Sequence, residues 1–455
     1  MNKKAPQHRY QPMIRGFSVT DLFGMYTYDV ALPDISDERG ERIILIYGDN
    51  GSGKTTIVNL IYHLLSRESM RGHRSYIART QFKDFTLKFS GGLFLVVTKN
   101  NDTGLGSYRI SLLNDRQEIR SVAVSSTLRD DEYSVKDRDV DDVELEELYD
   151  YLFQKNMECF LMADSREFHS DFFEKGSFEK VSSKFSFSED VIYHLNTGEI
   201  KRRKEVDQPT KQLKQSVARV ENWIKNQALE ARSANDASMS DIYKDLITRL
   251  GAFDDSPTKA DSHYKESLIE RLKDLAISNQ VLSRVGMASS VPVEEYKAAI
   301  ENASSANLPL IAQILTPYID SVQARIDSMK DVSTRLHIFT SIINKFYKNK
   351  SLHIDTVDGI SINAAKGGAI EVDVLSSGEK HLLILMCNIL LGTSQRSLFL
   401  VDEPELSLNI KWQRMLVDAL LDLSAGTSTQ FFMATHSIEL LAEHRNSTLR
   451  LDNLS

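Results

Sequence analysis

The stretch GDNGSGKTT, residues 48–56, decides the fold of this 455-residue chain. It fits the pattern G-x-x-x-x-G-K-[ST] and lies between an apolar, β-branched run, RIILIY at residues 42–47, and a helical pattern, TTIVNLIYHLLSR at residues 55–67. A strand, a glycine-rich loop and a helix in this order form a phosphate-binding turn. A glycine-rich turn with an incidental lysine is the alternative, and the flanking context disfavours it.

Each residue type in this loop has a chemical role. Gly48, Gly51 and Gly53 let backbone amides close around phosphate oxygens. Lys54 is expected to reach the terminal phosphates, and the Thr55 hydroxyl can coordinate Mg²⁺. The predicted nucleotide-binding residues of the loop are Gly48, Asn50, Gly51, Ser52, Gly53, Lys54, Thr55 and Thr56.

A second stretch, SLFLVDEPELSLN at residues 397–409, places Asp402 and Glu403 at the end of a buried strand. Carboxylates in such a position are costly unless a cation or a reaction uses them. In a P-loop fold, Asp402 then lies beside the magnesium ion, and Glu403 lies where a water would attack. We therefore predict that Asp402 binds the metal, directly or indirectly, and that Glu403 is catalytic. A strand that merely stops at a charged loop becomes the minor alternative beside the P-loop.

Two further motifs narrow the class of protein. In VLSSGEKHLLILMCNILLG, residues 374–392, Ser376, Ser377 and Gly378 begin an apolar helix and offer a second anion site. An ordinary capping box with Glu379 is the alternative, and taken alone it is favoured. In TSTQFFMATHS, residues 427–437, His436 ends a strand and can donate to a terminal phosphate, although a lone histidine there is usually structural.

Together these motifs resemble the ABC-type ATPases of the SMC, RecF and OLD (overcoming lysogenisation defect) group. The resemblance covers roughly residues 12–200 and 345–445 and rests on GDNGSGKTT, LSSGEK, LFLVDEPELSLN and MATHS. It implies ATP and Mg²⁺ as cofactors and a dimer or larger oligomer of ATPase heads, in which a serine-glycine signature closes over the nucleotide of the partner. The residues that it implies for this action in trans are Ser377, Gly378 and Glu379, and Ser376 is a further predicted nucleotide-binding residue beside them. It also implies that Ser407 lies in the loop after the acidic strand and that His436 is the switch histidine.

Some positions depart from the pattern of the family. Asn409 stands where the family often has histidine. The glutamine-loop residue has three candidates, Gln81, Gln154 and Arg166, and an exposed polar side chain is the alternative for each. OLD nucleases carry a TOPRIM nuclease domain after the ATPase, whereas only 19 residues follow His436 here, so we expect that domain to be absent.

Composition sets limits on the function. The chain is 41% hydrophobic and 26% charged, which is ordinary for a soluble globular protein of two or three domains. The net charge of −9 argues against a general nucleic-acid-binding surface, so any DNA contact has to be local. Cys159 and Cys387 lack zinc-site spacing and are expected to be reduced core residues. With no signal-like start and no run long enough for a bilayer, we expect a cytoplasmic protein without membrane contact.

Periodicity along the chain predicts the domain organisation. The runs before residue 47 and the two apolar runs joined by SGG within residues 83–101 read as strands, and residues 209–346 read as long polar helices. Residues 351–375 read as a β-hairpin. The predicted fold class is α/β, an ABC-type P-loop ATPase head with an antiparallel β subdomain and an inserted helical arm. The predicted domains are residues 1–208 with the P-loop, residues 209–346 as the helical insertion, and residues 347–455 with the signature, the acidic strand and His436.

Two functions fit these features. The first is a regulatory or sensor ATPase of a bacterial anti-phage defence system that controls a separate effector, expected to be a nuclease, as in the two-component systems of the Septu or PARIS type that it resembles. The alternative is a RecF- or SMC-like ATPase that binds DNA, supported by KRRK at residues 201–204 and MRGHRSYIAR at residues 70–79, although solvated charge explains both segments. A transporter subunit is disfavoured by the helical insertion and the SSGEK motif.

Overall fold

The chain forms two compact units, which are described separately. The computed structural model describes residues 12–32, 42–67, 72–115, 117–129, 132–136, 142–153, 157–163, 168–170, 191–193, 200–202, 208–227, 229, 262–284, 291–303, 307–355, 359–393 and 396–454. The head unit comprises Met1–Gln212 with Ser376–Ser455, and the arm unit comprises Leu213–Leu375. The sequence division placed these boundaries at residues 208 and 346.

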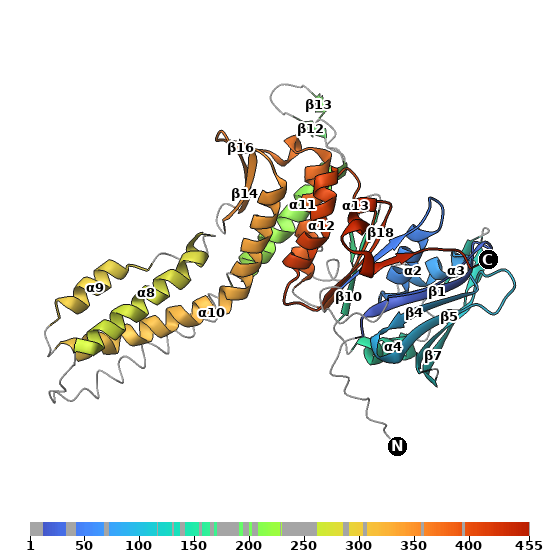
Figure 1. Ribbon diagram of the computed structural model, residues 1–455, viewed down its shortest axis with the longest axis horizontal. Helices are drawn as coiled ribbons and strands as arrows, with labels where there is room; N and C mark the ends of the chain where they lie inside the picture. Colours follow the sequence, from blue (N-terminus) through green and yellow to red (C-terminus); the bar gives the residue numbers. More distant parts are fainter. Residues whose placement is uncertain are drawn as a thin grey trace, which may run out of the picture. The chain divides into compact units, whose positions relative to one another are not determined.

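The head unit is organised around a mostly parallel sheet of six strands in the order β11-β10-β17-β18-β3-β19 (Figure 1). The five strands from β10 to β19 pair in parallel, and β11 pairs antiparallel with β10. All seven residues of β18 are buried, as expected for a central parallel strand that is covered on both faces. The bounds are β3 Ile43–Tyr47, β10 Met157–Met162, β11 Phe168–Ser170, β17 Arg396–Asp402, β18 Thr429–Thr435 and β19 Thr448–Arg450.

Successive side chains of β17 pack on opposite faces of this sheet. Leu398 and Leu400 belong to the hydrophobic core that also contains helix α2 (Lys54–Leu65). Phe399 lies on the other face, where its ring stacks on those of Phe160 and Phe431 at centroid distances of 4.7 and 5.5 Å. Helix α11 (Ser377–Gly392) covers that face, with Gly392 lying against the Phe399 ring. The apolar run of α11 is therefore buried on the sheet.

A second, antiparallel sheet of six strands completes the head unit, in the order β2-β1-β4-β5-β6-β7. Its strands alternate between buried and more exposed residues, the pattern of a sheet with one face on a core. That core is shared: the Phe17 ring of β1 lies 6.2 Å from the Phe432 ring of β18, and Ile57 of α2 belongs to the same cluster. The bounds are β1 Ile14–Leu22, β2 Tyr26–Ala31, β4 Asp84–Phe89, β5 Leu93–Thr98, β6 Tyr108–Asn114 and β7 Gln117–Val124, with the turn η1 (Ser90–Gly92) between β4 and β5.

The remaining elements of the head unit are shorter or peripheral. Helix α12 (Ile410–Leu423) begins soon after β17 and contacts α13 (Ile438–Ala442), which follows β18. The other elements are α3 His73–Arg79, β8 Thr127–Arg129, β9 Glu132–Ser134, α4 Asp142–Phe153, β12 Val191–Tyr193, β13 Ile200–Arg202 and η4 Arg445–Ser447.

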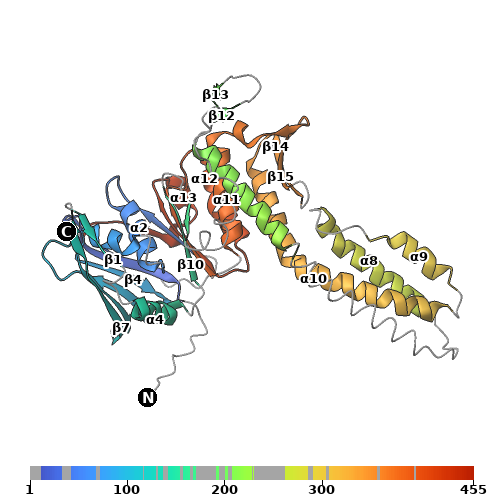
Figure 2. The same ribbon diagram turned by 180° about the vertical axis from the view of Figure 1, so that it is seen from behind.

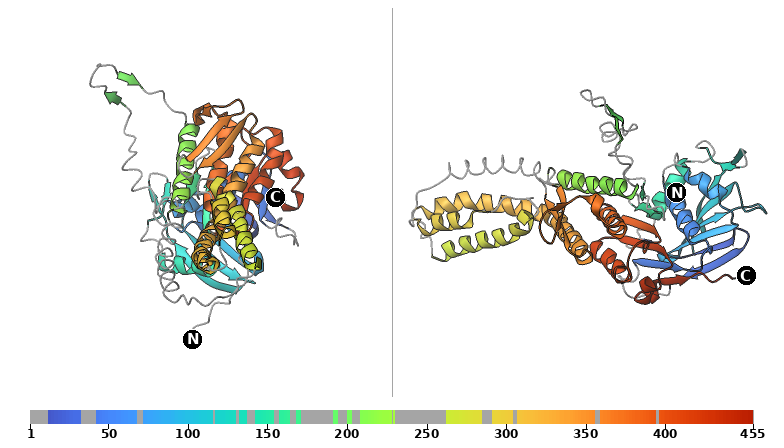
Figure 3. Two further views of the ribbon diagram at one scale, coloured as in Figure 1. Left: turned by 90° about the vertical axis from the view of Figure 1, so that its left-hand side faces the viewer. Right: turned by 90° about the horizontal axis from the view of Figure 1, so that it is seen from above.

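The arm unit is built on α10 (Leu308–Phe346), a continuous helix of 39 residues. Helices α8 (Ser262–Arg284) and α9 (Val293–Glu301) lie beside it (Figures 2 and 3). An ion pair of 2.7 Å joins Arg271 of α8 to Asp320 of α10. A small sheet of β14 (Lys350–Asp355), β15 (Gly359–Ala364) and β16 (Ala369–Ile370) follows α10 and precedes the turn η3 (Val372–Val374). A further helix spans residues 208–227 and reaches this sheet, because Glu221 accepts a 2.8 Å hydrogen bond from the Ile360 amide.

The α/β fold class is confirmed, since a parallel sheet and an antiparallel sheet accompany a long helix. The predicted SGG turn joins β4 to β5, and the predicted hairpin is β14 with β15. Helices occupy residues 208–227, 262–284 and 308–346 of the predicted helical region. Within the described ranges, no helix has both the length and the apolar character needed to cross a bilayer.

Candidate functional site

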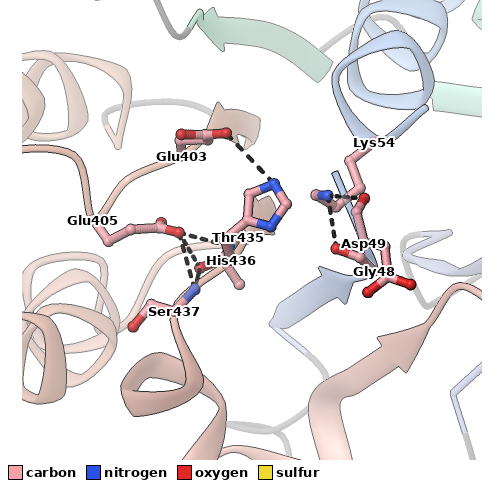
Figure 4. A network of polar contacts seen from close by, with 8 residues as sticks. All are labelled: Gly48, Asp49, Lys54, Glu403, Glu405, Thr435, His436 and Ser437. Carbon is pink, nitrogen blue, oxygen red and sulfur yellow. Dashed lines mark hydrogen bonds and ion pairs between the residues drawn. The ribbon is translucent and has the colours of Figure 1, made fainter. Parts of the chain in front are cut away.

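Three neighbouring strands of the parallel sheet bring the predicted site residues to one edge. Tyr47, the last residue of β3, pairs with Thr435, the last residue of β18. Asp402, the last residue of β17, pairs with Ala434 of the same central strand. Because carboxyl ends of parallel strands meet at one edge, the P-loop, the acidic segment and His436 all leave the sheet together (Figure 4). His436 follows β18 by one residue, whereas the sequence analysis placed it inside the strand end.

Backbone carbonyl groups of the P-loop hold the Lys54 side chain in place. The Lys54 ammonium donates to the carbonyl oxygens of Gly48 and Asp49 at 2.8 and 2.9 Å, and the side chain is buried. An ammonium has three donors, so two of them are used inside the loop. The arrangement pre-places the cation at the start of α2, where a terminal phosphate would meet it.

The start of α2 fits a phosphate group. Gly53 precedes the helix with φ 85°, and no side chain caps the first turn. A Cβ at this position would lie 2.7 Å from Leu22, so both the conformation and the space require glycine. The Ser52 hydroxyl is buried and makes no hydrogen bond among the described residues. Buried polar groups are normally hydrogen-bonded, so an uncapped helix start and this hydroxyl together suit phosphate oxygens.

The acidic segment faces the P-loop lysine. Burial lowers the pKa of Lys54, and the nearby carboxylates of Glu403, Asp402, Asp49 and Glu405 oppose that shift. Three of these four acids lie at the end of β17 or just after it. Strand β18 lies between β17 and the P-loop strand β3, and the negative charges of these acids still act on Lys54. The site therefore combines one buried cation with a group of carboxylates, the charge pattern that suits a nucleotide phosphate bound with a divalent cation.

The residues predicted to hold Mg²⁺ fit that role. Thr55 is exposed at the first turn of α2, and Asp402 is buried at the end of β17. In the described part of the chain, no group of three or more His, Cys, Asp and Glu side chains is arranged to hold a metal. Mg²⁺ bound with a nucleotide needs only one or two protein oxygens, because phosphates and water supply the remaining ligands. A hydroxyl and one carboxylate at this edge meet that requirement.

Glu403 and His436 face each other beside this edge. The His436 Nε2 lies 3.7 Å from Glu403 Oε1, and both side chains are about one-third exposed, at 33% and 30% (Figure 4). The Glu403 amide donates to the Ala434 carbonyl at 2.8 Å, which continues the contact of β17 with β18 by one residue. Glu403 has a φ of 49°, in the left-handed region that residues other than glycine rarely adopt. This backbone turn directs the carboxylate toward His436 instead of along the strand.

Sequence reasoning missed the role of Glu405. One of its carboxylate oxygens accepts hydrogen bonds from the Thr435 hydroxyl at 2.7 Å, the His436 amide at 2.6 Å and the Ser437 amide at 3.1 Å (Figure 4). The sequence shows Glu405 as a third acid after a buried strand, but its partners are at the end of a different strand and directly after it, about 30 positions further along the chain.

The signature residues lie at the start of α11. Ser376 and Glu379 form the capping box that the sequence analysis held as an alternative: the Glu379 carboxylate accepts from the amide and the hydroxyl of Ser376, each at 2.8 Å. Ser376 and Ser377 are exposed, whereas Gly378 is buried. A Cβ on Gly378 would lie 2.4 Å from the Ser407 carbonyl oxygen, so glycine permits the close approach of these two segments. The carboxylate of Glu379 is thus engaged in its own chain.

The remaining candidate residues lie in different parts of the head unit, and two of them fall outside the described residues. Asn409 is the N-cap of α12, where its side chain accepts from the Trp412 amide at 3.1 Å. The backbone of Gln81 accepts from the Phe23 amide at 3.0 Å. Gln154 and Arg166 lie outside the described residues. Asn50 belongs to the turn of the P-loop and Thr56 to the first turn of α2.

The two described arginines of the basic segment at residues 70–79 are both held by other groups of the chain. Arg74 is buried and donates to the carbonyl oxygens of His63 and Ser66 at 3.0 and 2.7 Å. Arg79 donates to the Tyr133 carbonyl and forms an ion pair with Glu132. Of the described arginines of this segment, Arg74 is therefore internal, whereas Arg79 is exposed and its charge is paired with Glu132. The KRRK side chains lie outside the described residues.

A family model described as "AAA domain, putative AbiEii toxin, Type IV TA system" matches residues 43–442. The chain belongs to this family. The matched region of the AAA domain begins at the first residue of β3 and includes the P-loop, the signature helix, the acidic strand and His436. This confirms a P-loop ATPase domain that extends across both units. No curated protein matches the sequence of this AAA-domain chain.

Several solved structures are similar to this AAA-domain protein. One is the SMC head domain with an extended coiled coil bound to the C-terminal domain of ScpA from Pyrococcus furiosus, with 14% identity, a TM-score of 0.38 and coverage of 98% of this chain and 97% of that chain. Another is the SMC head domain from Thermotoga maritima, with 13% identity, a TM-score of 0.31 and coverage of 98% and 100%.

We predict that Lys54→Ala lowers the affinity for ATP by on the order of 100-fold or more, because the buried cation at the phosphate site is lost. The measurement is titration of a fluorescent ATP analogue in the presence of Mg²⁺. Lys83→Ala, at an exposed lysine of the same unit, is the matched control and should bind as the wild type does. An unchanged affinity in Lys54→Ala would remove the P-loop from nucleotide binding.

Proposed function

We propose that this chain binds and hydrolyses ATP with Mg²⁺ and serves as a regulatory ATPase of a bacterial anti-phage defence system. The observation that supports ATP chemistry is the meeting of the P-loop, Asp402, Glu403 and His436 at the ends of adjacent strands. One edge of one unit thus offers a phosphate-binding loop, a metal position and a carboxylate for water.

The proposed roles follow from the position of each side chain. Lys54 and the amides at the start of α2 bind the terminal phosphates, and Thr55 with Asp402 holds Mg²⁺ directly or through water. An Mg²⁺ ion held by these two residues would supply positive charge beside the phosphate oxygens. Glu403 positions the attacking water and accepts its proton, and His436, beside it, donates to the terminal phosphate.

The exposed signature supports a pair of heads. Ser377 begins α11 with an exposed side chain, and the Glu379 carboxylate is already engaged with Ser376. In the ABC-type ATPases that the motifs resemble, such a signature closes over the nucleotide of the partner. A homodimer, or an assembly of dimers, is the proposed partner arrangement, since one isologous interface then completes two sites.

A separate effector is the proposed target of this ATPase. The family description names a putative toxin of a type IV toxin–antitoxin system, which supports a role in defence or growth arrest. The long helices of the arm unit offer a surface for another protein, proposed to be a nuclease, in the cytoplasm. The DNA-handling alternative has less support, because Arg74 is buried and the exposed Arg79 is paired with Glu132.

We predict that Glu403→Gln keeps ATP bound and lowers kcat by on the order of 100-fold or more, because an amide cannot accept the proton of water. Single-turnover hydrolysis and the affinity for the ATP analogue would be measured on the same preparation. A wild-type rate in this variant would exclude Glu403 as the base.

A mixing experiment tests the paired heads. Lys54→Ala and Ser377→Arg should each be inactive alone, whereas an equal mixture should regain about a quarter of the wild-type rate, because half of the dimers are mixed and hold one intact site of two. Subunit exchange would be verified with differently labelled chains. Exchange without recovered hydrolysis would contradict a site that is shared between two chains.

The defence role is tested in cells. The chain expressed together with its genomic neighbours should reduce the number of phage plaques, and Lys54→Ala and Glu403→Gln should each remove that protection while the proteins accumulate normally. Lys83→Ala should protect as the wild type does. Protection that survives both site variants would separate defence from ATP chemistry.

A further inference from the structure

Glu405 connects the acidic segment to the segment that carries His436. The amides of His436 and Ser437 follow the last paired residue of β18, so the sheet no longer supplies them with acceptors. Glu405 accepts from both amides and from the Thr435 hydroxyl. A single carboxylate oxygen therefore accepts from both of these amides, and the Ser437 amide has the Thr435 hydroxyl as a second acceptor at 2.9 Å.

The backbone of Glu405 is itself fixed from two directions. Toward the sheet, the preceding Glu403 amide donates to Ala434. Toward the signature helix, His381 Nδ1 lies 2.9 Å from the Leu406 carbonyl oxygen, and the Ser407 carbonyl lies against Gly378. Glu405 therefore lies in a turn whose backbone is hydrogen-bonded to β18 on one side and to the signature helix on the other.

The switch segment, which we define as residues 435–437, is also held at its Ser437 end. The Ser437 hydroxyl donates to Gln413 Oε1 at 2.7 Å and accepts from the Leu440 amide at 3.2 Å as the cap of α13. Between this cap and β18, the only described acceptor for the His436 amide is Glu405. The position of the His436 ring relative to Glu403 therefore depends on that contact.

We infer that Glu405 is a positioning residue for the proposed ATP hydrolysis, which holds His436 in reach of Glu403 and of the terminal phosphate. The inference rests on the proposed function. Glu405 does not take the place of Glu403 as base, because its Oε1 accepts from three donors and its Oε2 is buried, whereas the Glu403 side chain is 30% exposed. Its influence on the reaction passes through the backbone of the switch segment.

The test compares Glu405→Ala with Glu405→Gln. The alanine variant leaves the His436 amide without its acceptor and the Ser437 amide with the Thr435 hydroxyl alone, so kcat should fall by on the order of 10- to 100-fold while KM for ATP changes less than about threefold. The glutamine variant keeps an oxygen in the same place and should recover most of that loss. Rates are expressed per nucleotide-binding site, so that a loss of folded protein does not lower them. Glu443→Ala, at an exposed glutamate of the same unit, is the control and should match the wild type.

A double-variant cycle decides whether Glu405 acts through His436. If it does, Glu405→Ala combined with His436→Ala falls no further than His436→Ala alone. Effects that multiply, or a glutamine variant as slow as the alanine variant, would overturn the inference. A wild-type chain that hydrolyses no ATP would instead contradict the proposed function.

Discussion

The parallel pairing of β3, β18 and β17 is the constraint on which the candidate site depends. Asp402 and His436 lie hundreds of residues after the P-loop in the sequence, and only the pairing of their strands brings the three to one edge. Register matters as much as order, because side chains alternate between the two faces. A slip of β17 by one residue would exchange the faces of Leu400 and Val401 and direct the acids away from the P-loop.

Local patterns in the sequence predicted much of the fold. The loop GDNGSGKTT is contiguous, so its glycines, Lys54 and the following helix could be placed together from one motif. The SGG turn and its flanking apolar runs likewise contain the whole information for a hairpin. In each case the interacting residues are close in sequence, and backbone conformation and periodicity suffice.

Contacts between distant segments could not be predicted in this way. The insertion of β18 between the P-loop strand and the acidic strand is a matter of sheet order, which a single strand pattern does not encode. The contacts of Glu405 with residues 435–437, and the burial of Arg74 beneath two carbonyl groups, depend on segments that meet only after folding. At Ser376 and Glu379 two interpretations of one motif were open, and only side-chain geometry established the capping box. The chemical roles of the site residues remain predictions.

The backbone of Glu403 has a consequence for protein engineering. A residue with a Cβ bears a cost of about 1–2 kcal/mol in the left-handed conformation, whereas glycine adopts it freely. Glu403 occupies this conformation with a φ of 49°. A glycine there would relieve the backbone but would carry no carboxylate, so thermal stability and turnover make opposite demands on one position. A screen that ranks variants by melting temperature alone would therefore select against activity at the end of β17.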